Sequence, residues 1–170
     1  MKGNQNDYEI YKYGFQATIE QGLFIITCII IALFLHSLGA MLLFLLVFHL
    51  IRPYVGGFHF KNFIYCYLLS VVSATGVILL PKIIIIPIDL TFCLSVVLCG
   101  VTYLSLLGQA PNMEFRESEY YKKKLRRNLI IIVGLNLVGY MLNIPIAVVT
   151  ITLTMLLTTI SFLMVIVQQD

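Results

Sequence analysis

Residues 22–51, GLFIITCIIIALFLHSLGAMLLFLLVFHLI, form an apolar run broken mainly by His36, Ser37 and His49. A transmembrane helix needs about 20 residues, so this run is too long for one simple span. His36, Ser37 and Gly39 mark a turn in its middle and predict two short helices of roughly 14 residues, about 21 Å each at the α-helical rise. Since each arm is shorter than a full bilayer crossing, we expect this hairpin to pack against other parts of the protein.

The composition of the whole chain is that of a membrane protein. Of its 170 residues, 60% are hydrophobic and 11% are charged, whereas a soluble domain has about 45–50% apolar residues. Mean hydropathy is +0.97. The composition predicts an all-α, polytopic integral membrane protein with a single domain. The net charge of +3 comes from basic residues beside apolar segments, which suits an anionic membrane surface and argues against nucleic acid as a partner.

The N-terminal segment predicts an amphipathic helix in the membrane interface. Tyr8, Tyr11, Phe15 and Ile19 recur at helical spacing, while polar residues fall on another face. The expected organisation of the single domain is an interfacial helix at 1–21, a short hairpin at 22–51, a polar loop at 52–62, spans at 63–80 and 90–107, a basic loop at 108–128, and spans at 129–142 and 146–167.

Prolines and polar residues set the later boundaries. Pro81 ends the third of these apolar segments, and Asp89 is placed to cap the helix that follows Pro87. Asn143 and Pro145 separate the last two apolar segments. We therefore expect about six hydrophobic segments.

Basic residues fix the expected topology, because Lys and Arg near span ends stay in the cytoplasm. With six segments, ten of the eleven basic residues fall on one face and Lys82 alone on the other. The ten are Lys2, Lys12, Arg52, Lys61, Arg116, Lys122, Lys123, Lys124, Arg126 and Arg127. We expect a multi-pass membrane protein, with residues 52–66 near the cytoplasm.

Residues 52–66, RPYVGGFHFKNFIYC, gather the chain's candidates for covalent chemistry. His59 and Cys66 are seven positions apart, which on one straight helix is about 10.5 Å along the axis and too far for proton transfer. The chain must fold back if the two act together, and the glycine pair permits the necessary dihedrals. Asn62 can then cap a helix whose first turn holds Cys66, where the helix dipole favours a thiolate. An interfacial histidine and a packed cysteine are the other interpretation of these residues.

The pattern R-x-x-x-G-G-x-H-x-x-x-x-x-x-C, formed by Arg52, Gly56, Gly57, His59 and Cys66, resembles the accessory gene regulator protein B (AgrB) family of membrane endopeptidases. The resemblance covers most of the chain. It implies a protein of the bacterial cytoplasmic membrane in which Cys66 is the nucleophile and His59 its base, with the two glycines supporting the catalytic loop at 52–62. Arg52 either supports that loop or contacts a lipid phosphate. The substrate would be an AgrD-like propeptide, which is cleaved through a thioester and cyclised to a (thio)lactone signal for quorum sensing. Membrane lipids are further partners. The sequence leaves open whether the protein forms a homodimer, and it implies no cofactor.

Five basic residues lie close together, just before the last two apolar segments. They form the basic segment, Lys122, Lys123, Lys124, Arg126 and Arg127. The segment anchors topology, and it is a candidate for binding the acidic tail of a propeptide by charge complementarity.

Other sites are not favoured by the sequence. The spacing of Cys28, Cys93 and Cys99 matches neither a redox pair nor a zinc site, so we expect small buried hydrophobic residues there. His36 and His49 have no ligand partners at metal spacing, and no metal site is predicted. The alternative function is a non-catalytic membrane module that binds or exports a peptide or lipid; such a module would work without Cys66.

Overall fold

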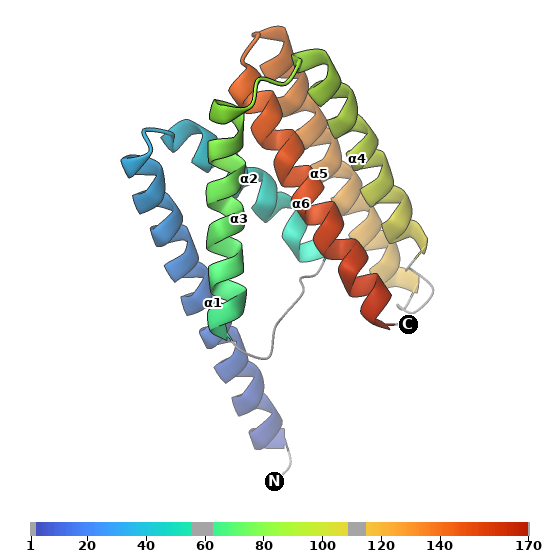
Figure 1. Cartoon of the computed structure of the whole chain (residues 1–170). Helices are drawn as coiled ribbons and strands as arrows, with labels where there is room; N and C mark the ends of the chain where they lie inside the picture. Colours follow the sequence, from blue (N-terminus) through green and yellow to red (C-terminus); the bar gives the residue numbers. More distant parts are fainter. Residues whose placement is uncertain (1–2, 56–62, 109–114, 170) are drawn as a thin grey trace.

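The computed structural model describes residues 3–55, 63–108 and 115–169, and these residues form six helices and no strand (Figure 1). The helices are α1 (Gly3–Phe34), α2 (Leu38–Val55), α3 (Phe63–Ile83), α4 (Ile88–Gly108), α5 (Phe115–Met141) and α6 (Pro145–Gln169). The all-α prediction is confirmed for this part of the chain.

The turn predicted inside residues 22–51 is confirmed. Helix α1 ends at Phe34 and α2 begins at Leu38, and between them His36 has a φ of 49°. Asn143, in the turn between α5 and α6, has a φ of 52°. Residues other than glycine adopt this left-handed conformation uncommonly, and Asn, Asp and His do so more often than the rest, so both positions suit a turn between helices.

A separate helix for residues 1–21 is not found. Residues 3–34 form one continuous helix of 32 residues, so the predicted interfacial helix and the first arm of the hairpin are a single element. Gly14 lies within this helix. One glycine costs about 1 kcal/mol in a helix interior, and without a proline nearby this does not end the helix.

The other boundaries also differ in their detail. Helix α3 runs to Ile83 and contains Pro81, because a proline in a final turn removes only one helical hydrogen bond. Asp89 lies inside the first turn of α4 and is not its cap; its Oδ1 accepts a hydrogen bond of 2.7 Å from the hydroxyl of Tyr140. The predicted basic loop at 108–128 is helical from Phe115 onward.

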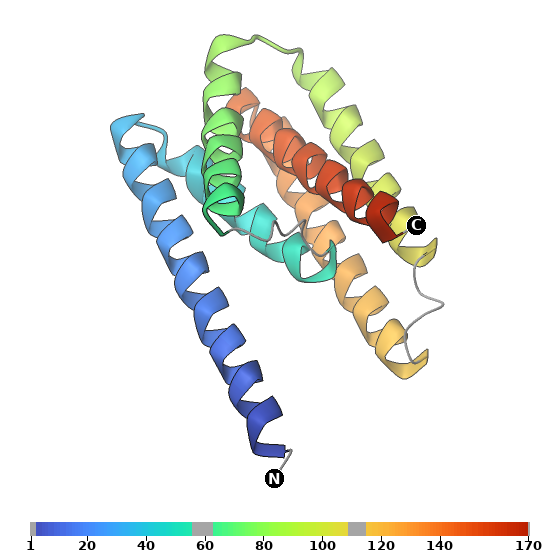
Figure 2. The same ribbon diagram turned by 60° about the horizontal axis from the view of Figure 1, so that its bottom comes forward.

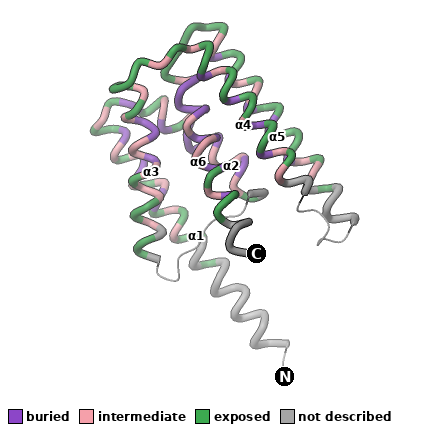
Figure 3. Tube along the Cα trace, turned by 45° about the vertical axis from the view of Figure 1, so that its right-hand side comes forward, coloured by how far each residue is buried: buried purple, intermediate pink, exposed green. Residues whose placement is uncertain are grey.

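Helix α6 is central in the packing, since it contacts α2, α3, α4 and α5. Buried residues recur along α6 and α2 in Figure 3. One buried cluster joins Val47 and Ile51 of α2 to Leu125 and Leu129 of α5. A second buried cluster joins α1, α2 and α3.

Side-chain hydrogen bonds join α4 to α5 and α6 at several levels. They run from Thr102 to Thr159 (2.9 Å), from Thr152 to the carbonyl of Thr91 (3.0 Å), from Asn136 to Ser95, and from Tyr140 to Asp89 (2.7 Å). Helices in lipid gain little from the hydrophobic effect and depend more on packing and on such bonds. These four hydrogen bonds, which we call the polar seam, hold α4, α5 and α6 together as one unit.

The surface is strongly apolar. Phe34, Ile83 and Met141 are each more than 70% exposed, and Ile85 is fully exposed. Among the described residues, two helical stretches are long and apolar enough to cross a membrane, Ile88–Ser105 and Pro145–Met164. Shorter apolar helical stretches cover Thr18–Phe34, Leu38–Pro53 and Tyr67–Ile83. The six-span topology stays a prediction.

Candidate functional site

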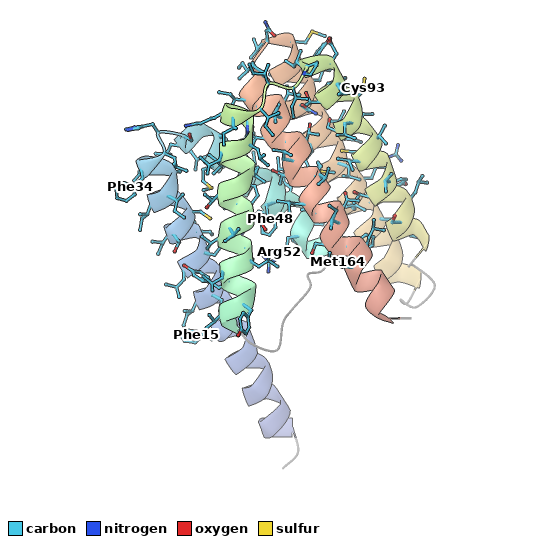
Figure 4. The ribbon with its side chains drawn as sticks, viewed as in Figure 1. Phe15, Phe34, Phe48, Arg52, Cys93 and Met164 are labelled. Carbon is cyan, nitrogen blue, oxygen red and sulfur yellow. The ribbon has the colours of Figure 1, made fainter. Side chains whose placement is uncertain are left out.

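The C-terminal end of α2 leads to the predicted catalytic loop, and buried contacts hold it in place. Val47 and Ile51 are fully buried. The guanidinium of Arg52 lies 5.1 Å from the ring centre of Phe48, and Figure 4 shows the two side chains at this end of α2. A cation over an aromatic ring is stabilised by the ring quadrupole. Arg52, predicted to support the loop, is therefore partly ordered by its own helix.

Two further contacts hold the same end of α2. The side-chain amide of Asn128, in α5, donates a hydrogen bond of 2.7 Å to the carbonyl of Leu50. Gln21 of α1 pairs with the imidazole of His49. These contacts tie α2 to α5 on one side and to α1 on the other.

Cys66 is the fourth residue of α3, which begins at Phe63. The expectation that it lies in the first turn or so of a helix is confirmed by this boundary. Backbone N–H groups at a helix N-terminus carry a partial positive charge and favour a thiolate. The side chain of Cys66 lies outside what the structure describes.

The other members of the predicted loop are outside the described residues. These are His59, Gly56, Gly57 and the proposed cap Asn62. The pairing of His59 with Cys66 therefore stays a prediction.

The residue after Cys66 ties α3 to α1. The hydroxyl of Tyr67 lies 2.6 Å from Oγ1 of Thr27, and the two share a hydrogen bond. Tyr67 also packs against the cluster of buried residues of α1, α2 and α3. The start of α3 is thus anchored beside the predicted nucleophile.

The remaining cysteines divide into two groups. Cys28 and Cys99 are buried, as predicted, at 0% and 6% exposure. Cys93 is exposed, so the prediction for it is wrong; Figure 4 shows it on the outer side of α4. Its neighbours Leu90, Leu94 and Val97 are exposed too, because this face of α4 turns away from the bundle.

The basic segment lies on the N-terminal part of α5. Lys123, Arg126 and Arg127 are exposed, and Lys122 and Lys124 are half-buried. Nζ of Lys124 lies 5.3 Å from the ring centre of Tyr120 and donates to its hydroxyl at 3.4 Å.

Two leucines fix the orientation of the basic segment. Leu125 and Leu129, 3% and 6% exposed, pack against Val47 and Ile51 of α2. They are four residues apart and so share a helix face. The basic segment is therefore held beside the end of α2 that leads to the catalytic loop.

The pattern of the sequence did not single out Asn128 or Thr27. Thr27 lies in an apolar run, which is the signal of a polar contact between membrane helices, whereas Asn128 directly follows Arg126 and Arg127 and carries no such signal. Among the described residues, no group of three or more His, Cys, Asp or Glu side chains is placed to hold a metal ion.

Comparison with known proteins gives one match. The sequence model of the family described as Accessory gene regulator B matches residues 1–168. No curated protein and no solved structure matches the chain.

Proposed function

The chain belongs to the accessory gene regulator B (AgrB) family, and from that membership we propose that it is a membrane-embedded cysteine endopeptidase. Its substrate is an AgrD-like propeptide, from which it removes the C-terminal tail before cyclisation. The observation that carries this proposal is the place of Cys66, in the first turn or so of α3, directly after a loop with glycines and a histidine.

The local electrostatics support Cys66 as the nucleophile. A thiolate is the reactive form of cysteine, and a helix N-terminus stabilises it. Cys28 and Cys99 are buried in the core, and Cys93 lies on an apolar outer face of α4. Cys66 is the cysteine that follows a polar loop.

The reaction begins when His59 takes the proton of the Cys66 thiol. The thiolate attacks the carbonyl carbon at the end of the signal sequence, and the tetrahedral intermediate expels the nitrogen of the next residue. His59 returns its proton to that leaving amine, so the products are a free acidic tail and a thioester on Cys66.

Cyclisation follows from the thioester. A thiol or hydroxyl inside the bound peptide attacks the same carbonyl carbon and displaces the thiolate of Cys66, which closes a (thio)lactone ring. Thiol attack exchanges one thioester for another at little change in free energy, whereas the conversion of amide to thioester is uphill. Removal of the tail therefore drives the sequence, and water must be excluded from the thioester.

The basic segment supports recognition of the tail. Three of its cations are exposed, and it is packed against the end of α2 through Leu125 and Leu129. An acidic tail bound there would gain charge complementarity and would lie near the start of the cleaving loop. We place both on the cytoplasmic side of a multi-pass membrane protein, in agreement with the distribution of basic residues.

The test is to compare cysteine variants in liposomes. Cys66→Ala should abolish cleavage of the propeptide, as followed by mass spectrometry. The triple variant Cys28→Ala, Cys93→Ala and Cys99→Ala should keep cleavage. A Cys66→Ala protein that still cleaves the propeptide would end the enzyme proposal, and transport of uncleaved peptide by that variant would favour an export module.

A further inference from the structure

The last turn of α2 lacks one helical hydrogen bond because it contains a proline. Pro53 lies inside it and has no backbone N–H, so the carbonyl of His49 has no donor four residues later. Proline also loosens the turn sterically. The end of α2 therefore depends on contacts from other helices for its position.

Asn128 supplies such a contact from α5. Its side chain is 6% exposed, and Nδ2 donates to the carbonyl of Leu50 at 2.7 Å. The bond reaches α2 one turn before Pro53, next to the carbonyl that proline leaves without a donor. Figure 2 shows α5 beside the end of α2, and the two helices are in contact.

Buried residues around this bond fix the position of α5 against α2. Leu125 and Leu129 lie on either side of Asn128 in the sequence and are buried against Val47 and Ile51. A buried amide that loses its partner costs about 1–3 kcal/mol, so Asn128 favours the one register of α2 against α5 that provides a carbonyl at this level.

We propose that Asn128 is a positioning residue, which sets the end of α2 against the basic segment of α5. The inference rests on the proposed function, because it assigns the two parts that Asn128 connects to peptide cleavage and to binding of the acidic tail. Asn128 touches neither substrate nor reacting atoms. It fixes the distance between the basic segment and the end of α2 from which the predicted catalytic loop starts.

The proposal predicts a specific change in kinetics. Asn128→Leu keeps the branched shape of the side chain and suits the apolar neighbours, but it has no donor for the carbonyl of Leu50. The basic segment still binds the tail, so KM should stay within about two-fold, while kcat should fall on the order of 10- to 100-fold because the reacting groups are misplaced. Asn128→Gln, which keeps the amide donor, should recover part of kcat.

Asn136→Leu is the matched control. Asn136 is also on α5 and is 1% exposed, but it bonds to Ser95 of α4. This variant should lose stability and keep the kcat of its folded fraction, measured per mole of protein that remains monodisperse in detergent. Should Asn128→Leu fail to accumulate, Asn128→Ser, which is too short to reach the carbonyl, answers the same question.

The outcomes separate the two proposals. A kcat within about two-fold of the parent in every Asn128 variant would overturn the positioning role, as would equal losses in the Asn128→Leu and Asn136→Leu proteins. If Cys66→Ala cleaved the propeptide as well, the proposed function itself would fail. If Cys66→Ala were inactive and Asn128→Leu fully active, the positioning role alone would fail.

Discussion

The hydroxyl of Tyr67 in α3 shares a hydrogen bond of 2.6 Å with Oγ1 of Thr27 in α1. Tyr67 directly follows Cys66, so this bond links the first turns of α3, which hold the predicted nucleophile, to α1, the longest of the described helices. A bond between membrane helices contributes about 0.6 kcal/mol on average. Because the bond is made by the residue next to Cys66, its loss would act directly on the position of the predicted nucleophile.

Tyr67→Phe should lower the free energy of unfolding by about 0.6 kcal/mol. If the activation free energy of cleavage rises by the same amount, the cleavage rate should fall about three-fold. Unfolding in detergent and the rate of propeptide cleavage measure the two effects. Tyr65→Phe is the control, because Tyr65 is 63% exposed. Equal effects of both changes would show that the bond to Thr27 has no special role.

His59→Ala should reduce the cleavage rate on the order of 10² to 10⁴, as expected when a general base is removed. His36→Asn is the control. His36 lies in the turn after α1 with a φ of 49°, and asparagine tolerates this conformation better than alanine. A His59→Ala protein that cleaves within a few-fold of the parent would show that the base is another residue.

Changing Lys122, Lys123 and Lys124 together to Gln should raise KM for an acidic-tailed propeptide and leave membrane insertion unchanged. Single exposed charges are weak and screened by salt, so each single change should have little effect. Neutralising the acidic residues of the tail should remove most of the difference, which a double-mutant cycle measures. Equal weakening for acidic and neutral tails would leave the basic segment a topology anchor alone.

The topology can be mapped with single cysteines in a background that lacks the natural ones. Gly57→Cys and Ser118→Cys should resist a membrane-impermeant thiol reagent in intact cells and react in inverted vesicles. Ile85→Cys, in the turn between α3 and α4, where the side chain is fully exposed, should not share this pattern. Labelling at position 118 from outside the cell would contradict the predicted orientation.

Thr102 and Thr159 test the polar seam. Thr102→Val and Thr159→Val should each destabilise the protein, and the double variant should be more stable than the sum predicts. The coupling between them should be about 0.6 kcal/mol. Thermal unfolding of the three variants measures it, and strict additivity would mean that the bond of 2.9 Å contributes nothing.

Turn signals and apolar runs were enough to predict most of the helices. The turn at His36 and Ser37 and the break at Asn143 are confirmed by the ends of α1, α2, α5 and α6. Both breaks interrupt long apolar runs with polar or helix-breaking residues, and such signals are local. They can be recognised without knowing what packs against them.

Errors arose where tertiary packing outweighed local pattern. The charges of residues 115–128 suggested a loop, but Leu125 and Leu129 bury one face against α2 and keep the segment helical. Cys93 looked like a core residue because its run is apolar, and hydropathy alone does not tell a lipid-facing side from a protein-facing one.

In the candidate site, too, local features could be predicted from the sequence and tertiary contacts could not. A motif of residue types predicted Cys66 near the start of a helix, and the boundary of α3 agrees. The contact of Asn128 with Leu50 joins residues 78 positions apart. Such a contact depends on how α5 crosses α2, which no local pattern in either segment encodes.

The unbroken course of α1 has a mechanical consequence. Its 32 residues make a rod of about 48 Å, against a hydrocarbon layer of about 30 Å. The apolar part, Thr18–Phe34, is clamped at Phe24, Cys28 and Ala32, while the N-terminal half projects past the other helices in Figures 1 and 2. A displacement of the N-terminal half of α1 would therefore be transmitted to the packed part of the helix. Thr27, the partner of Tyr67, lies within that packed part.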